Sequence, residues 1–217
     1  MSLIPQLIPI EVNNEYIKNT VLTNVIKMLT ARKLLLKDNE EKNIKKITDT
    51  PSDDLIYKVD YENKDIKEKK EKPYIIIKII NQKITAINKA SPIGEFLYQY
   101  KNDTKLVIVK SISNKTRQLV ITTFPNTEVF LEKELMMNII DHVYVPKHEL
   151  LSNEEAEQVM ESYNARKRDM PKILTNDPIA RYYNMEAGQI CRIIRPSETA
   201  GFTPYYRLVI KGSFASD

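Results

Sequence analysis

The sequence predicts an α+β fold, with an N-terminal α/β domain over residues 1–140 and a small mixed α+β domain over residues 141–217. Strand and helix signals alternate between residues 73 and 141, as in small α/β layer domains. This texture changes near residues 143–149. Residues 1–140 carry 23 Lys and Arg against 18 Asp and Glu, a net charge of +5, whereas residues 141–217 carry 10 against 11, a net charge of −1. The asymmetry indicates two modules with different partners.

The chain opens with a helix and then a highly charged stretch. From Asn14 to about Leu36, apolar residues recur at three- and four-residue spacing, which predicts a helix with one apolar stripe. Residues 37–72 contain 21 charged residues among 36, with poor periodicity and a proline. We therefore expect most of residues 37–72 to be a loop or insertion, partly mobile.

The alternating region follows in order along the chain. The isoleucine-rich run 73–80 predicts a strand. Ser91 and Pro92 then suit the N-cap and first position of a short helix through Tyr100. Residues 105–110 predict a strand, 114–119 one or two helical turns, 121–124 another strand and 131–141 a helix.

The C-terminal domain begins with a capping box at Ser152, which predicts a helix whose apolar face is Ala156, Val159, Met160 and Tyr163. Asp177 followed by Pro178 predicts a second short helix through Tyr183, and Asn184 can end it in the left-handed conformation. Residues 189–195 and 205–211 predict strands. The connection 196–204 is long for a hairpin, so we expect a binding loop there.

Composition excludes several function classes. The chain has one cysteine, two histidines and four glycines, so it has no internal disulfide framework, no histidine-rich metal cluster and no glycine-rich phosphate loop. The apolar start, 1–10, contains two prolines and fits neither a signal peptide nor a membrane span. We expect no cofactor, no metal, no catalytic residue, no membrane association and no secretion.

One enzymatic alternative remains open. Asp53, Asp54, Glu62 and Lys64 faintly match the spaced carboxylates and lysine of Mg²⁺-dependent nucleases. A charged run produces such matches by chance. His142 and His148 are expected to be packing or surface residues, and Cys191, next to apolar Ile190 in a predicted strand, a buried structural thiol.

A basic stretch suits phosphate contact. Residues 82–120 contain seven Lys and Arg against one Glu and one Asp. The candidates lie where a predicted strand leads into a helix, and they are Lys110, Ser113, Asn114, Lys115 and Arg117. Hydroxyls, amides and cations at such a turn favour phosphate over base contact, so binding would be non-specific. An ordinary solvated basic face is the alternative.

The C-terminal domain contains residues typical of protein interfaces. Arginine and tyrosine, which dominate interface hot spots, are concentrated between residues 177 and 207. The predicted contact residues are Asp177, Pro178, Arg181, Tyr182, Gly188, Arg192, Arg195, Pro196, Ser197, Glu198, Thr199, Gly201, Tyr205 and Arg207. The alternative is that they hold a loop of a small domain together.

Three segments carry a family resemblance. They are Asp177-Pro178-x-Ala180-Arg181-Tyr182, Gly188-Gln189, and the run from Ile193-Ile194-Arg195-Pro196 to Gly201. They resemble the signature of the small shared subunit of DNA-directed RNA polymerases, which is the fifth subunit of the eukaryotic nuclear enzymes and has a counterpart in the archaeal enzyme. The resemblance covers about 141–211, and 1–140 looks like the eukaryotic jaw domain.

The resemblance implies a non-catalytic polymerase subunit, present once in a hetero-oligomer. The C-terminal domain would be an assembly domain that docks on the largest subunit and neighbouring small subunits. The N-terminal domain would be a jaw beside downstream duplex DNA. The location would be the nucleus for a cellular protein, or the virion and a cytoplasmic viral factory for a large DNA virus. A free-standing nucleic-acid-binding module and a Mg²⁺-dependent nuclease are the alternatives.

Overall fold

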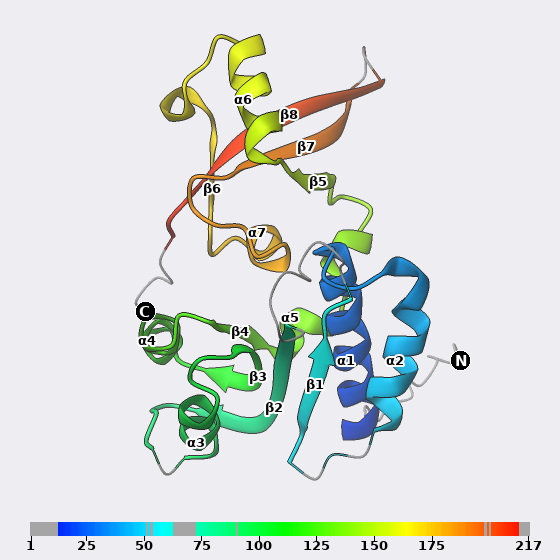
Figure 1. Ribbon diagram of the computed structural model, residues 1–217, viewed down its shortest axis with the longest axis vertical. Coiled ribbons are helices and arrows are strands. Elements are labelled where there is room, and N and C mark those ends of the chain that lie inside the picture. The colour runs from blue at the N-terminus through cyan, green and yellow to red at the C-terminus, as the bar shows by residue number, and fades with distance from the viewer. Residues whose placement is uncertain are drawn as a thin grey trace, which may run out of the picture.

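The computed structural model describes residues 13–50, 52, 54–62, 73–89, 91–197, 199 and 201–212. It contains two four-stranded mixed sheets, with strand orders β1-β2-β3-β4 and β5-β7-β8-β6 (Figure 1). We call the first sheet with its helices the N-terminal module and the second sheet with its helices the C-terminal module. The α+β class is confirmed. The boundary at residue 140 remains a prediction.

The first sheet is built mainly from parallel strands. β2 (Tyr74–Ile84), β3 (Thr104–Ile112) and β4 (Thr127–Leu131) are parallel, and β1 (Ile56–Asp60) pairs with β2 in the antiparallel direction. The crossover helices α3 (Pro92–Gln99) and α4 (Asn114–Thr123) pack on one face of this sheet. α1 (Asn14–Ala31), α2 (Glu40–Asp49) and the short α5 (Glu132–Leu135) pack on the other face, beside the 3₁₀ turns η1 (Lys37–Asn39) and η3 (Ile139–Asp141).

Two hydrophobic cores follow from strand alternation. Ile75 and Ile77 of β2 face α1, whereas their neighbour Ile76 faces α3 and α4. The predicted apolar stripe of α1 forms the centre of the first core, where Leu22 and Ile26 are fully buried. The helix ends at residue 31, five residues before the predicted end.

The prediction that residues 37–72 form mostly a loop is wrong for the described part. α2 and β1 both lie within it, and the side chains of Ile47, Tyr57 and Val59 are buried in the α1 core. The charges mislead because they occupy the exposed faces of a short helix and an edge strand, whose few inward positions are apolar. Residues 51, 53 and 63–72 lie outside the described residues.

A second prediction, a strand at residues 121–124, is also wrong. α4 continues to Thr123, and the strand comes next, at 127–131. Val120 and Phe124 pack against the sheet from the helix, so tertiary packing overrides the β-branched propensity of residues 120–123. The predicted helix 131–141 is in fact α5 and η3, separated by residues 136–138.

The C-terminal module contains β5 (Lys147–Leu150), α6 (Asn153–Ser162), η4 (Lys167–Asp169), β6 (Lys172–Leu174), α7 (Pro178–Tyr182), β7 (Ile190–Ser197) and β8 (Gly201–Ile210). The predicted caps are confirmed: Ser152 forms a capping box with Glu155, and the Asp177 side chain accepts from the N–H of Ile179. Asn184 has the predicted left-handed φ of 50°.

The predicted long loop at 196–204 is instead part of a β-hairpin. β7 and β8 pair continuously from Ile190 opposite Leu208 to Ser197 opposite Gly201. The two prolines in this segment favoured a loop prediction, because proline is rare in strands. The hairpin extends beyond the short flanking strands, at the upper right of Figure 1.

Candidate functional site

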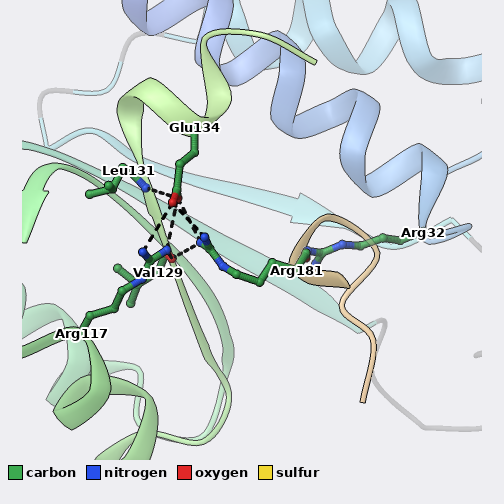
Figure 2. A network of polar contacts seen from close by, with 6 residues as sticks. All are labelled: Arg32, Arg117, Val129, Leu131, Glu134 and Arg181. Atoms are coloured by element: carbon green, nitrogen blue, oxygen red, sulfur yellow. Dashed lines mark hydrogen bonds and ion pairs between the residues drawn. The ribbon is translucent and has the colours of Figure 1, made fainter. Parts of the chain in front are cut away.

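A polar cluster joins the two modules beside the end of β4. Glu134 of α5 accepts hydrogen bonds from Arg181 of α7 at 2.9 and 3.1 Å, and from Arg117 of α4 at 3.2 and 3.5 Å (Figure 2). The N–H of Leu131 also donates to Glu134, at 2.8 Å. Both arginines donate to the carbonyl of Val129, at 2.6 and 2.7 Å. One carboxylate and one carbonyl thus hold guanidinium groups from both modules.

The cluster is largely buried. Arg117 is only 4% exposed, and burial lowers the pKa of its guanidinium. Burial alone would raise the pKa of Glu134, but the hydrogen bond and positive charge of Arg181 outweigh it, so the pKa of Glu134 lies below its usual value. The guanidinium of Arg181 also lies 4.4 Å from the ring centroid of Phe130.

A third arginine joins α1 to α7. Arg32 follows the last residue of α1 and makes a bidentate pair with Glu128 of β4, with both distances 2.7 Å. Its guanidinium also donates to the carbonyls of Tyr182 at 2.8 Å and Arg181 at 2.9 Å. A helix leaves its last carbonyls short of intrahelical partners. Arg32 supplies a donor to the carbonyl of Tyr182 and a second donor to that of Arg181, which also accepts from the N–H of Asn184.

The contacts of Glu134, Arg117, Arg181 and Arg32 form what we call the joint between the two modules. They change the interpretation of three predicted site residues. Arg181 and Tyr182 were expected on a protein-binding surface, but Arg181 is bound within the chain and the side chain of Tyr182 lies in the α1 core. Arg117 was expected near DNA, but its buried guanidinium faces Glu134 and Val129. Contact of Arg117 with a phosphate is therefore excluded in this conformation. The partners of these residues are far away in sequence, so no local pattern could reveal them.

The outer half of the β7–β8 hairpin is the most exposed candidate surface. We call residues 194–197 and 201–206 the hairpin tip. Strand alternation gives the tip two different faces. One face carries Arg195 and Tyr205, whose guanidinium carbon and ring centroid are 3.6 Å apart. The other face is apolar and carries Ile194, Pro196, Phe202 and Pro204, with Phe202 72% exposed.

Other predicted contact residues surround the hairpin. Arg192 pairs with Glu149 of β5 at 2.6 and 2.9 Å, and Arg207 is exposed on β8 opposite Cys191. Gly188 and Gly201 both have positive φ, 96° and 70°, which favours glycine at the two ends of the hairpin.

The remaining predicted contact residues lie at helix and hairpin ends. Asp177 and Pro178 start α7. The hydroxyls of Ser197 and Thr199 are 3.5 Å apart at the hairpin turn. Glu198, another predicted contact residue, lies outside the described residues.

The predicted DNA-proximal residues are only partly brought together. Ser113 caps α4, its hydroxyl accepting from the N–H of Thr116, and Asn114 is the first residue of that helix. Lys110 and Lys115 are exposed at the carboxyl end of the parallel strands. Lys110 lines a cavity of about 320 Å³ on the α1 side, whereas Lys115 belongs to α4 on the opposite face.

The described residues give the enzymatic alternative little support. Glu62, one carboxylate of the nuclease pattern, accepts from the N–H of Leu36 and the side-chain amides of Asn39 and Asn43. Asp53 and Lys64 lie outside the described residues. Within the described ranges, no three His, Cys, Asp or Glu side chains come together as a metal site.

The three residues considered for other chemistry have ordinary surroundings. The Cys191 thiol is buried as predicted, and burial raises its pKa to about 11. His148 is half-buried and makes a hydrogen bond of 2.7 Å with the carbonyl of Pro146, and His142 is exposed. In the described part of the chain, no helix has the length and apolar character that a membrane span requires.

Comparison with known proteins finds relatives of the C-terminal module. Residues 137–209 match the family model described as RNA polymerase Rpb5, C-terminal domain. The chain is 43% identical over 75 residues to DNA-directed RNA polymerase subunit Rpo5 of Methanocaldococcus jannaschii, covering 35% of this chain and 96% of that protein. The chain belongs to the RNA polymerase subunit 5 family.

Longer relatives match over part of their length. The chain is 37% identical over 134 residues to DNA-directed RNA polymerase subunit 5 of Acanthamoeba polyphaga mimivirus, covering 62% of this chain and 64% of that protein. It is 47% identical over 83 residues to DNA-directed RNA polymerases I, II, and III subunit rpabc1 of Dictyostelium discoideum, covering 38% of this chain and 42% of that protein. The match thus spans less than two thirds of these two subunit 5 family members.

Proposed function

We propose that this chain is a non-catalytic subunit of a DNA-directed RNA polymerase. The observation that carries the proposal is the 43% identity over 96% of an archaeal protein whose name is that of a polymerase subunit. The exposed hairpin tip supports it, because arginine and aromatic side chains stacked on a projecting element are typical of protein-binding hot spots. Nucleotide addition would belong to other subunits.

The C-terminal module would dock on the largest subunit and neighbouring small subunits, with one copy per complex. Arg195, Tyr205 and Phe202 are the central contacts that we propose, since they are exposed on adjacent strands of the hairpin tip. The site of action would be the nucleus of a cell, or the virion and cytoplasmic factory of a large DNA virus. The mimivirus and Dictyostelium relatives are consistent with either location.

The N-terminal module would form a jaw beside downstream duplex DNA. Lys110 and Lys115 remain candidates for phosphate contact. Because Arg117 is buried, we propose Lys83 as the third candidate. Lys83 is exposed on β2 and pairs in register with Ser111, beside the start of α4. Such contacts would be non-specific and weaker at high salt, because they neutralise phosphates and do not read base edges.

Stoichiometric co-purification tests the assembly part of the proposal. A tagged chain expressed in its own host or infected cell should be recovered with the large polymerase subunits at one copy per complex. Arg195→Ala should reduce its incorporation about 30-fold, since one hot spot is worth about 2 kcal/mol. Arg166→Ala is the matched control, because the Arg166 side chain is 70% exposed in the same module and pairs with nearby Asp169. Equal incorporation of the two variants would contradict docking through the hairpin tip.

Crosslinking tests the DNA part separately. In assembled elongation complexes, charge reversal of Lys83, Lys110 and Lys115 should reduce crosslinking of downstream DNA, and more at low salt than at high salt. Charge reversal of Lys42, Lys45 and Lys46, exposed on α2, is the control of equal charge change. A chain that crosslinks nucleic acid but never co-purifies with a polymerase would instead support a free-standing nucleic-acid-binding module.

A further inference from the structure

Both free edges of the hairpin tip carry a proline. On β8, β6 pairs only with residues 208–210, so the outer edge of residues 201–207 has no strand partner in the described part of the molecule. On β7, the pairing with β5 ends at Lys147 opposite Ile194. Exposed strand edges present unpaired N–H and C=O groups to which another strand can add. The hairpin tip would therefore be open to strand addition on both sides, were its backbone donors intact.

The hydrogen bonds of β8 fix which of its backbone groups point outward. The N–H of Leu208 donates to the carbonyl of Pro171, on the outer side, at 2.8 Å. The N–H of Val209 donates to the carbonyl of Gln189, on the β7 side, at 2.9 Å. Backbone direction alternates along a strand and the register to β7 is unbroken, so Phe202, Pro204 and Tyr206 also face outward. Pro204 therefore stands at the middle of the three outward positions.

The edge of β7 is closed in the same way. The carbonyl of Ile190 accepts from the N–H of Leu151, so even-numbered positions of β7 face the β5 side. Ile194 is the last of them opposite β5, and Pro196 is the next. Proline has no N–H to donate, and its ring crowds an approaching strand, which is why it is found at sheet edges. The outward position of β7 just beyond β5 thus lacks a donor.

We infer that Pro196 and Pro204 block strand addition to both edges of the hairpin tip, so that a second copy of the chain cannot pair with it and a partner must engage its side-chain faces. Either proline at an inward-facing position would have removed a hydrogen bond between β7 and β8. Both stand instead where their missing N–H leaves the β7–β8 hydrogen bonds intact. The exposed apolar face, which ends at Phe202 and Pro196 beside the turn, makes this protection necessary, because exposed apolar strand edges associate readily.

Self-association of the free full-length chain tests the inference. Pro196→Thr with Pro204→Thr restores both donors and adds β-branched side chains that favour strands. We expect the parent chain to sediment as a monomer. The double variant should associate at a concentration at least about tenfold lower than the parent needs, because each restored hydrogen bond at a paired edge raises affinity a few-fold or more. Amide hydrogen exchange should show new protection at residues 202–206 in the associated variant.

Thr203→Val is the matched control. It raises strand propensity and apolar surface in the same strand, but the N–H of residue 203 already faces β7. Circular dichroism spectra establish whether each variant is folded. If the double variant does not fold, the single variant Pro204→Thr is used in its place. Equal association of parent, control and proline variants, or a parent chain that is itself a strand-paired dimer, would overturn the inference. The experiment needs no polymerase, so its result is independent of the proposed function.

Discussion

Replacing Glu134 by Gln is the most direct test of the joint between the two modules. The substitution keeps the shape of the side chain and one carbonyl oxygen, but removes the negative charge between Arg117 and Arg181. The new amide N–H₂ group would also face guanidinium or backbone donors that have no acceptor to offer in return. Two cations, whose side chains are 5% and 14% exposed, would then face each other without an anion.

The expected cost is about 3 kcal/mol of the free energy of unfolding. Breaking a buried ion pair costs about 3–5 kcal/mol, and the 29% exposure of the Glu134 side chain places this case at the low end. Glu149→Gln is the matched control, since Glu149 is similarly exposed at 25% but its partners Lys147 and Arg192 are 69% and 35% exposed. That control should cost about 1 kcal/mol or less.

Urea denaturation followed by far-UV circular dichroism measures both values on the full chain. Because Glu134 links α4, α5 and α7, the Gln variant should also show a broadened or two-step transition as the modules uncouple. Equal losses for the Glu134 and Glu149 variants would refute the reasoning, since they would mean that burial of the arginines contributes nothing.

Three further outcomes are expected. Because the pKa of Glu134 is lower in the folded state than its unfolded value of about 4.3, its carboxylate stabilises the fold above that pH, and this stabilisation is lost as pH falls through the folded pKa. The difference in the free energy of unfolding between the parent and the Gln variant, measured by urea titration, should therefore shrink below about pH 4. Lys105→Met should lower the free energy of unfolding, measured by thermal unfolding, by about 2 kcal/mol, because the buried ammonium of Lys105 donates to the carbonyls of Tyr100 and Asp103 at 2.6 and 2.9 Å. No loss of stability would mean that water satisfies these carbonyls in the variant. Tyr57→Phe should raise the free energy of unfolding by about 1 kcal/mol, because the buried hydroxyl of Tyr57 has no hydrogen-bond partner among the described residues. A loss of stability would show that this hydroxyl does have a partner.

Local signals in the sequence predicted much of the fold. The caps at Ser91, Ser152 and Asp177 lie within three residues of the N–H groups that they bind, so their partners are given by the chain itself. The parallel strands β2 and β3 are continuous apolar runs, as strands covered on both faces must be. The subunit 5 motifs were recognisable for the same reason, since each is a short contiguous run.

What failed were inferences about segments whose structure depends on distant packing. Residues 37–62 looked like a solvated insertion until α1 and β2 supplied a surface for their few apolar side chains. Residues 196–204 looked like a loop because two prolines are poor strand formers, although both occupy edge positions where strands tolerate them.

By itself, the sequence determined the starts of the helices capped by Ser91, Ser152 and Asp177, the central strands and the family, because each depends on residues close together along the chain. Only the tertiary structure decided that Arg117 and Arg181 are internal and that Arg195 is exposed. Arg181 meets Glu134 across 47 residues and Arg32 meets Glu128 across 96. An arginine fork has the same composition whether it binds a partner, a phosphate or its own chain, and the carboxylate that folding brings within 3 Å selects among them.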